Sequence, residues 1–229
     1  MTTQTATAPG TTLHSRDRRS ISAPPTAGIA FAAAWVIGLL VWPSNLDVAA
    51  SGSRVVSAYA GHQSVAVTQY LLVEGLAAIA LAIVVVTLAR AALRRGAERP
   101  GRVIILAGMG AVMVSLAECA LGLMLAAGAV PDGDAGRAAT LFHLINRLDG
   151  VKMIALAAVA LGGVSLARRS VIVPRWLGYV GAALAGAMIA SGIGYLLLDN
   201  PLAQVAAASL ALLLIWVPAT GITVGRAGR

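Results

Sequence analysis

Long apolar segments, each interrupted by one acidic residue, are the feature that most restricts how this chain can fold. Valine, leucine, isoleucine and alanine run almost unbroken through residues 65–89 and 103–130, and Glu74 and Glu118 are the charged residues inside them. A helix needs about 20 predominantly apolar residues to cross the hydrocarbon core of a bilayer. Both segments reach this length, so the sequence predicts membrane-spanning helices.

The composition of the whole chain agrees with a membrane protein. Of its 229 residues, 59% are hydrophobic and 11% are charged, whereas a soluble domain carries about 25% charged residues. The net charge of +8 does not indicate nucleic acid, because the basic residues flank apolar segments instead of gathering on one solvated face. The single cysteine, Cys119, excludes an intramolecular disulfide framework and leaves the redox compartment open.

The apolar runs predict an all-α, polytopic membrane protein with a bundle of six transmembrane helices over residues 26–225. A basic tail, residues 1–25, rich in Thr, Ser, Ala and Pro, is expected to be disordered. The first run also fits a signal peptide cleaved near Ala50, but we favour an uncleaved helix because six spans complete an even set. The predicted spans are residues 26–42, 65–89, 103–130, 146–167, 176–198 and 203–225.

The distribution of basic residues predicts the orientation. With a cytoplasmic N-terminus, the inner segments contain three, five, three and two lysines or arginines, thirteen of the seventeen in the chain. Cytoplasmic loops of membrane proteins carry such an excess, so both termini are expected inside. Aromatic residues suit interfacial belts, with Trp176 and Tyr179 near the inner boundary and Trp42, Tyr70 and Tyr195 near the outer one.

Five charged residues in the outer half of the predicted bundle are the candidates for a polar pocket: Glu74, Glu118, Asp149, Lys152 and Arg147. A charged side chain at a helix centre costs about 2.5–3.5 kcal/mol on insertion scales, so these groups are expected to face inward. The helical rise places Glu118 about 18 Å, and Lys152 about 9 Å, from the outer ends of their predicted spans. A water-filled vestibule open to the outside would satisfy all of them.

Glu118 is the candidate proton-binding group, because an acid near mid-membrane without a cation favours its neutral form. Asp149 and Lys152 are i, i+3 neighbours and can pair on one helix face. The alternative is a structural role, in which Glu118 pairs with Lys152 or Arg147, or hydrogen-bonds Ser115, and only fixes helix register.

Signals for enzymatic chemistry are weak. His62 and His143 lack the spacing that places two metal ligands on one helix, and we interpret both as solvated loop histidines. Residues 132–136 resemble the opening of a calcium loop, but the acid at its twelfth position is absent. No nucleophile elbow, phosphate loop or dinucleotide fingerprint is present. The sequence therefore predicts no catalytic residue, metal or cofactor, and argues against an enzyme.

Small residues recur at every fourth position of the fifth predicted span. Such a stripe lets another helix approach closely. We favour packing within the bundle, and a homodimer face is the alternative. The stripe consists of Gly178, Ala182, Gly186, Ala190 and Gly194.

Four short motifs carry a family resemblance: Ala27-Gly28-Ile29, the span-three Glu118, Val173-Pro174-Arg175-Trp176-Leu177-Gly178 and Ile215-Trp216. On these motifs, residues 26–224 resemble the DUF4386 family of bacterial six-span membrane proteins. The resemblance implies the fold, the topology and a bacterial plasma membrane, but no activity. In similar proteins an arginine precedes the span-three glutamate by three residues; here Ser115 stands there, which leaves the partner of Glu118 open.

Two functions fit these observations. The first is a small-molecule or proton-linked binding or transport role with an outward-facing pocket lined by Glu74, Glu118, Asp149 and Lys152. The alternative is a non-catalytic membrane scaffold or accessory subunit that packs through small-residue helix faces. The expected partners are the lipid bilayer, a second copy or another membrane protein, and an unidentified small molecule, but no nucleic acid.

Overall fold

The computed structural model describes residues 23–41, 46–169 and 172–227, and these residues contain helices and connecting turns but no strand. The predicted tail therefore lies almost entirely outside the described residues. The first two spans are α1 (Ala23–Val41) and the continuous run of α3 (Gln63–Tyr70), the π-helix η1 (Leu71–Leu76) and α4 (Ala77–Arg94), with the short helix α2 (Gly52–Tyr59) between them. The others are α5 (Glu98–Met124) with the π-helix η2 (Leu125–Ala129), α6 (Ala135–Arg168), α7 (Arg175–Leu197), and α8 (Asn200–Ala203) followed by α9 (Ala206–Ala227).

Six helical segments in the described part of the chain are long and apolar enough to cross a membrane, with mean hydropathy between 1.7 and 2.6. The prediction of an all-α chain with six such helices is confirmed, and these helices support a multi-pass membrane protein. Residues on the outside of the bundle are large and apolar, such as Leu40, Leu106 and Leu197, which are 78%, 75% and 70% exposed. Such a surface suits contact with lipid tails.

The fourth span differs from its prediction. α6 begins at Ala135 instead of about Asn146, so most of the predicted loop before it is helical. Asp134 caps the helix, because its side chain accepts a hydrogen bond of 3.0 Å from the backbone N–H of Arg137. Phe142 is buried in this added part, in a cluster that includes residues of α2. The early start therefore reflects a cap followed by tertiary packing.

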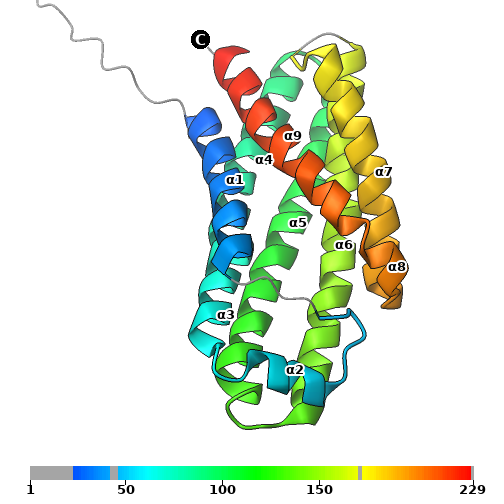
Figure 1. Cartoon of the computed structure of the whole chain (residues 1–229). Coiled ribbons are helices and arrows are strands. Elements are labelled where there is room, and N and C mark those ends of the chain that lie inside the picture. The colour runs from blue at the N-terminus through cyan, green and yellow to red at the C-terminus, as the bar shows by residue number, and fades with distance from the viewer. Residues whose placement is uncertain (1–22, 42–45, 170–171, 228–229) are drawn as a thin grey trace, which may run out of the picture.

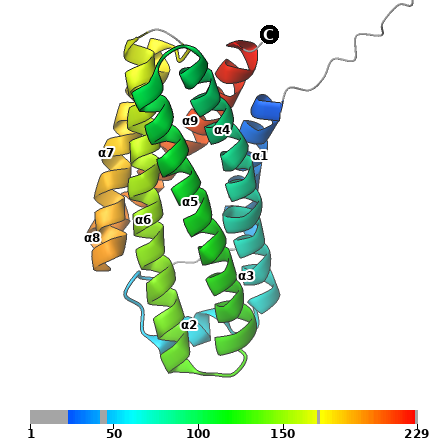
Figure 2. The same cartoon turned by 180° about the vertical axis from the view of Figure 1, so that it is seen from behind.

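The six long helices form a closed ring in which each helix packs beside the next one in sequence. The order is α1, α4, α5, α6, α7 and α9, and α9 returns to contact α1 (Figures 1 and 2). α6 and α7 approach each other most closely at two glycines: a Cβ on Gly150 would lie 2.7 Å from the carbonyl oxygen of Gly192, and one on Gly192 would lie 3.0 Å from that of Gly150. Any side chain at either position would separate the two helices.

Two apolar cores lie along the bundle. The larger includes Ala77 to Ala92 of α4, Ile104 to Val112 of α5 and the C-terminal half of α6. The smaller includes Ala66 of α3, Leu125 of η2 and Phe142 of α6. Glu74, Glu118 and Lys152 each fall between the two cores along their own helices. A polar layer therefore separates the cores.

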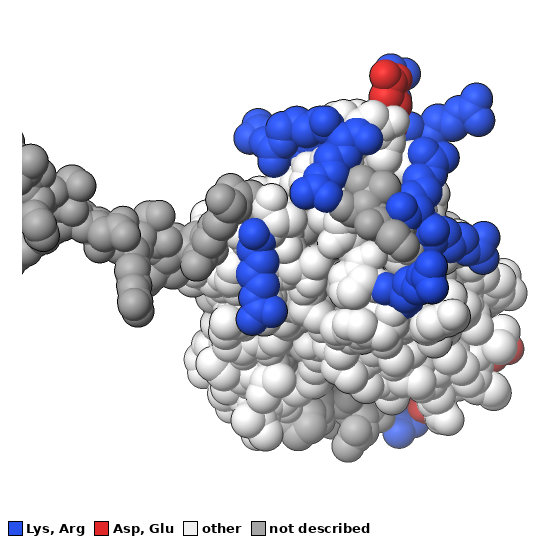
Figure 3. Space-filling model, turned by 90° about the horizontal axis from the view of Figure 1, so that it is seen from above, with Lys and Arg blue, Asp and Glu red and all other residues white. Residues whose placement is uncertain are grey.

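Arginines concentrate at one end of the bundle, where α1 begins and α9 ends (Figures 1 and 3). Glu98 is the one acidic residue that the structure describes there, and it pairs with Arg102 at 3.2 Å. The opposite end carries acids and fewer cations, including the Arg54–Asp47 and Arg137–Asp132 pairs. The two ends of the bundle therefore differ strongly in charge. The arginines of the first end are Arg90, Arg94, Arg95, Arg99, Arg102, Arg168, Arg169, Arg175 and Arg226.

Candidate functional site

Four of the five predicted pocket residues meet in one buried cluster, which we call the acid–lysine cluster: Glu74, Glu118, Asp149 and Lys152. The Lys152 ammonium is at its centre. Its Nζ lies 2.8 Å from Glu74 Oε2 and 3.0 Å from Glu74 Oε1. The same nitrogen lies 2.5 Å from Glu118 Oε2 and 2.8 Å from Asp149 Oδ1. One cation thus contacts three carboxyl groups from three segments of the chain.

Local backbone geometry brings Glu74 to the cluster. It lies in η1, where the helix widens to the π form between α3 and α4. Isolated π turns within α-helices are rare and are frequent at functional sites. Ser115, one turn before Glu118 on α5, donates a hydrogen bond of 2.7 Å to Glu74 Oε2. Glu74 therefore accepts hydrogen bonds from α5 and from α6.

Ser115 and Lys152 resolve two points that the sequence left open. Ser115 donates its hydrogen bond to Glu74 instead of Glu118. The partner of Glu118 is Lys152 of α6. The remaining candidate, Arg147, lies on the exposed surface of α6.

The cluster has more negative than positive groups. Three carboxyl groups surround one ammonium, so full ionisation would leave two net negative charges in the interior of the bundle. Carboxylates that share one site do not all stay ionised, because like charges at short distance repel strongly in a medium of low dielectric. The excess of carboxyl groups therefore favours uptake of a proton or of another cation.

One oxygen of the cluster has no hydrogen-bond donor among the residues that the structure describes. This oxygen is Glu118 Oε1, which is buried, whereas Glu118 Oε2 accepts from Lys152. A buried carboxylate oxygen without a donor is costly. One oxygen of Glu118 and one of Glu74 lie within 4.8 Å of each other, so a proton on Glu118 would reduce the repulsion between the two acids. Protonation of Glu118 would remove one negative charge, and Oε1, the oxygen without a donor, could carry the proton.

The acid–lysine cluster is more enclosed than the predicted vestibule. The side chains of Glu118, Lys152 and Glu74 are 1%, 6% and 12% exposed, and only that of Asp149 reaches 22%. Because α6 starts at Ala135, Lys152 lies about 26 Å along the helix, not about 9 Å as predicted from the later start. Asp149 is the most exposed member of the cluster.

Tyrosines line two sides of the cluster. Tyr70 of α3 packs on Gly122, where a Cβ would lie 2.3 Å from the ring, and it interacts electrostatically with Glu74 and Glu118. Its hydroxyl lies 3.2 Å from that of Tyr59 in α2. Burial raises the pKa of Tyr59, and the hydrogen bond with Tyr70 opposes this effect. Tyr195 of α7 interacts with Asp149. Tyr70, predicted as an outer belt residue, is half-buried beside the cluster.

Three acidic oxygens of the cluster, one each from Glu74, Glu118 and Asp149, lie within 4.8 Å of one another. Carboxylate oxygens are ligands of hard cations such as Ca²⁺ and Mg²⁺. The Lys152 ammonium already lies within 3.0 Å of each carboxyl group. A metal ion would therefore have to replace the ammonium, and the arrangement fits proton binding better.

The end of the bundle opposite the arginines is held by the segment of residues 46–51. Asn146 Nδ2 donates to the carbonyl of Val48 at 3.2 Å, and Asn200 Oδ1 accepts from the Val48 amide at 3.1 Å. His143 Nε2 lies 3.0 Å from the carbonyl oxygen of Ala50. His143 is therefore half-buried on α6 and not a solvated loop histidine, whereas His62 is exposed.

The small-residue stripe of α7 divides between two environments. Gly178 and Gly194 pack inside the chain, where a Cβ would lie 2.6 Å from Ala167 and 2.4 Å from the backbone of Ala203. Ala182 and Gly186 are exposed, and a Cβ on Gly186 would meet nothing within 4 Å. Steps of four residues drift around a helix of 3.6 residues per turn, so the stripe cannot stay on one face. The fifth member, Ala190, is half-buried.

Sequence reasoning missed two members of the site. The sequence suggests Ser115 as a hydrogen-bond partner of Glu118, but its partner is Glu74. Glu74 lies in a π turn, which the residue pattern does not predict. Tyr70 was assigned to the membrane interface because its place near the end of a predicted span suited a belt. A glycine one turn after Glu118, at Gly122, was the available signal for a bulky neighbour.

Comparison of the chain with family models, with curated proteins and with solved structures finds no match.

Proposed function

We propose that the protein binds and releases a proton at the acid–lysine cluster, and that this exchange is linked to the binding or transport of a small solute. The observation that carries the proposal is the ratio of three buried carboxyl groups to one ammonium. Acidic residues within membrane spans commonly mark proton relays.

Glu118 is the group proposed to carry the exchangeable proton. It is the most buried acid of the cluster, and its Oε1 has no donor. Glu74 is held by Ser115 and by both contacts of the ammonium, so its ionised form is the better stabilised of the two. The charged and titratable groups around Glu118 are Glu74 of η1, Tyr70 of α3, Asp149 and Lys152 of α6, and Tyr195 of α7.

Asp149 is the proposed route for the proton. Its side chain is more exposed than those of the other three, and it contacts the same ammonium as Glu118. Movement of Lys152 toward Asp149 would leave Glu118 uncompensated and favour its protonation. Movement in the opposite direction would favour its release. Lys152 thus connects an accessible acid with an inaccessible one.

Infrared difference spectroscopy of the purified protein, titrated in pH, tests this proposal. The expected result is a protonated carboxyl band that disappears as pH rises, is lost in Glu118→Gln, and persists in Glu98→Gln. Glu98 is a matched control because it is an exposed acid on the same helix. A wild-type spectrum without a titrating carboxyl band, or one in which Glu118→Gln leaves that band unchanged, would contradict the proposal.

The alternative function, a scaffold or accessory subunit, is favoured by one observation. Ala182 and Gly186 present small side chains on the outer surface of α7, which suits contact with another helix. Gly186→Leu tests it, since the added side chain meets nothing within this chain. Loss of a co-purified partner or second copy, with unchanged thermal stability, would support the scaffold role.

The membrane and the orientation belong to the same proposal. The arginine-rich end faces the cytoplasm of a bacterial cell, with both termini inside, and the chain belongs to the DUF4386 family. The support is the charge difference between the two ends and the motifs around Glu118 and residues 173–178. A reporter fused to the C-terminus, active only in the cytoplasm, tests the orientation.

A further inference from the structure

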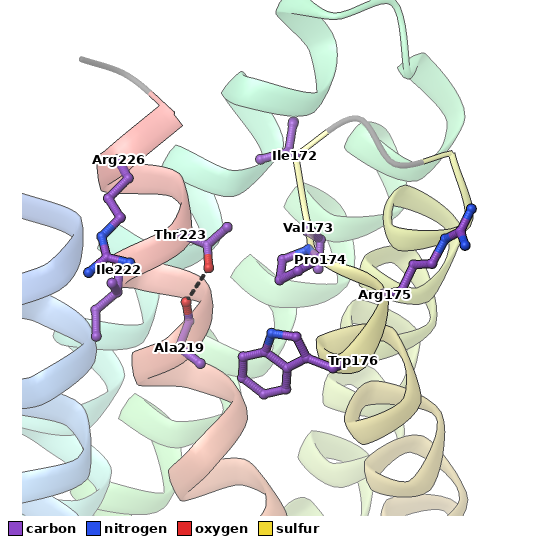
Figure 4. A pocket seen from close by; sticks show the side chains of 9 residues that line it. All are labelled: Ile172, Val173, Pro174, Arg175, Trp176, Ala219, Ile222, Thr223 and Arg226. Carbon is purple, nitrogen blue, oxygen red and sulfur yellow. Dashed lines mark hydrogen bonds between the residues drawn. The ribbon is translucent and has the colours of Figure 1, made fainter.

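A second site, independent of the acid–lysine cluster, lies at the arginine-rich end between the start of α7 and the end of α9. A pocket of about 630 Å³ opens there. Arg175 of α7 and Arg226 of α9 border this pocket; in Figure 4 they stand at its two outer edges with their guanidinium groups turned away from each other, and the Trp176 indole lies between the two helices. Nothing in the proposed proton chemistry uses these residues.

The lining combines positive charge with apolar surface. Ile172, Val173 and Ile222 contribute apolar walls beside the two arginines. The hydroxyl of Thr223 donates to the carbonyl of Ala219 in its own helix at 2.7 Å, so its proton is already used. The arginines therefore supply the main polar attraction, and the walls favour a ligand with an apolar part.

The two arginines have no acidic partner among the described residues, because Glu98, the acid at this end, pairs with Arg102. Both arginines are exposed. Pro174, which also lines the pocket, precedes α7 and gives this helix no side-chain cap. An anion is therefore favoured by guanidinium groups and by the helix terminus together.

A neighbouring groove of about 330 Å³ shares Arg175 and continues along α6 and α7 past Arg168, Tyr179 and Ala182. Arg175 therefore borders both the pocket and this groove, and both have apolar residues in their lining. Trp176 and Tyr179 are 52% and 77% exposed, as suits side chains at a membrane interface. A ligand with one charged head and two apolar chains fits this arrangement.

We propose that this pocket binds the phosphate head of an anionic phospholipid, with its acyl chains along α7 and α9. Free phosphate shares the charge but would leave the apolar walls unused, and a zwitterionic lipid would bring its own cation to the arginines. Basic pockets between membrane helices on the cytoplasmic side favour anionic heads for the same reason.

The test titrates the purified protein in neutral detergent with phosphatidylglycerol carrying brominated tails, which quench a nearby indole such as Trp176. Each arginine at an anionic lipid head strengthens binding about fivefold, so Arg175→Gln with Arg226→Gln should weaken it about 30-fold. The control pair, Arg94→Gln with Arg99→Gln, removes the same charge from exposed sites at the same end. It should change the affinity less than about threefold.

Two further arms separate the occupants. Brominated phosphatidylcholine should quench only at much higher concentration, and inorganic phosphate should not displace the brominated phosphatidylglycerol. Ala219→Phe, which fills the pocket without changing charge, should weaken binding, and Thr223→Leu provides a second filling variant if the first fails to fold. Equal losses in the two arginine pairs, no preference over phosphatidylcholine, or full displacement by phosphate would each overturn the proposal.

Discussion

Replacing Lys152 by methionine removes the cation at the centre of the acid–lysine cluster and leaves most of the side chain's volume in place. The ammonium contacts three carboxyl groups at 2.5 to 3.0 Å, and its side chain is 6% exposed. Removal of one partner from a buried ion pair destabilises a protein by about 3–5 kcal/mol, because the other charge stays uncompensated. We expect Lys152→Met to lower the free energy of unfolding by an amount in this range at pH 8, measured by reversible unfolding in mixed micelles.

The loss should shrink as the pH falls. Without Lys152, the folded protein must neutralise Glu74, Glu118 and Asp149 with protons, whereas the unfolded chain leaves them ionised at neutral pH. The folded state of the variant then binds more protons than the unfolded state, so its stability decreases as pH rises. The difference from the wild type is therefore expected to be clearly smaller at pH 5 than at pH 8.

Arg147→Met is the matched control, because it replaces a cation by methionine on the exposed surface of the same helix. It should change stability by no more than about 0.5 kcal/mol at either pH. A second comparison adds Glu74→Gln and Glu118→Gln to Lys152→Met, and this neutral cluster should recover most of the lost stability. Equal effects of the two methionine variants, or a loss that does not depend on pH, would refute the reasoning.

Two further predictions concern packing. Gly122→Ala should destabilise the protein by about 1–3 kcal/mol, because its Cβ would lie 2.3 Å from the Tyr70 ring; Gly110→Ala, on the same helix with nothing within 4 Å, should be neutral or stabilising in the same thermal unfolding assay. Asn200→Ala should cost about 1 kcal/mol and speed amide hydrogen exchange at Val48, because Asn200 Oδ1 accepts from that amide at 3.1 Å. Ser53→Ala, in the same outer region, is its exposed control, and an unchanged Val48 exchange rate in Asn200→Ala would contradict the assignment.

The sequence predicted the six helices because the length and polarity of membrane spans follow directly from the thickness of the bilayer. It also predicted that Glu74, Glu118 and Lys152 face inward, since the cost of charge in lipid acts on each residue separately. The pairing of Asp149 with Lys152 followed from helical spacing alone. These features depend on local pattern and on solvent.

The parts that could not be predicted depend on tertiary structure. The π turn at Glu74 changes which face of the helix carries the acid, and no side-chain pattern distinguishes it from an α-helix. The depth of Lys152 was underestimated because residues 135–145 are polar enough to resemble a loop, yet they are held as a helix by the Asp134 cap and by packing of Phe142. Whether Gly186 faces another helix of the chain or the outside depends on the rotation of α7 about its axis, and the spacing of the small residues does not determine this rotation.

Because the polar layer lies between two apolar cores, the acid–lysine cluster also affects how the helices are held together. η1, α5 and α6 meet through Lys152 at the level where neither core supplies packing. A change in the proton count there alters the attraction among these three helices while leaving both cores intact. Under the proposed function, proton exchange at Glu118 would therefore change how strongly α6 is held against α5, and a solute would be coupled to this change only if it bound one protonation state more tightly than the other.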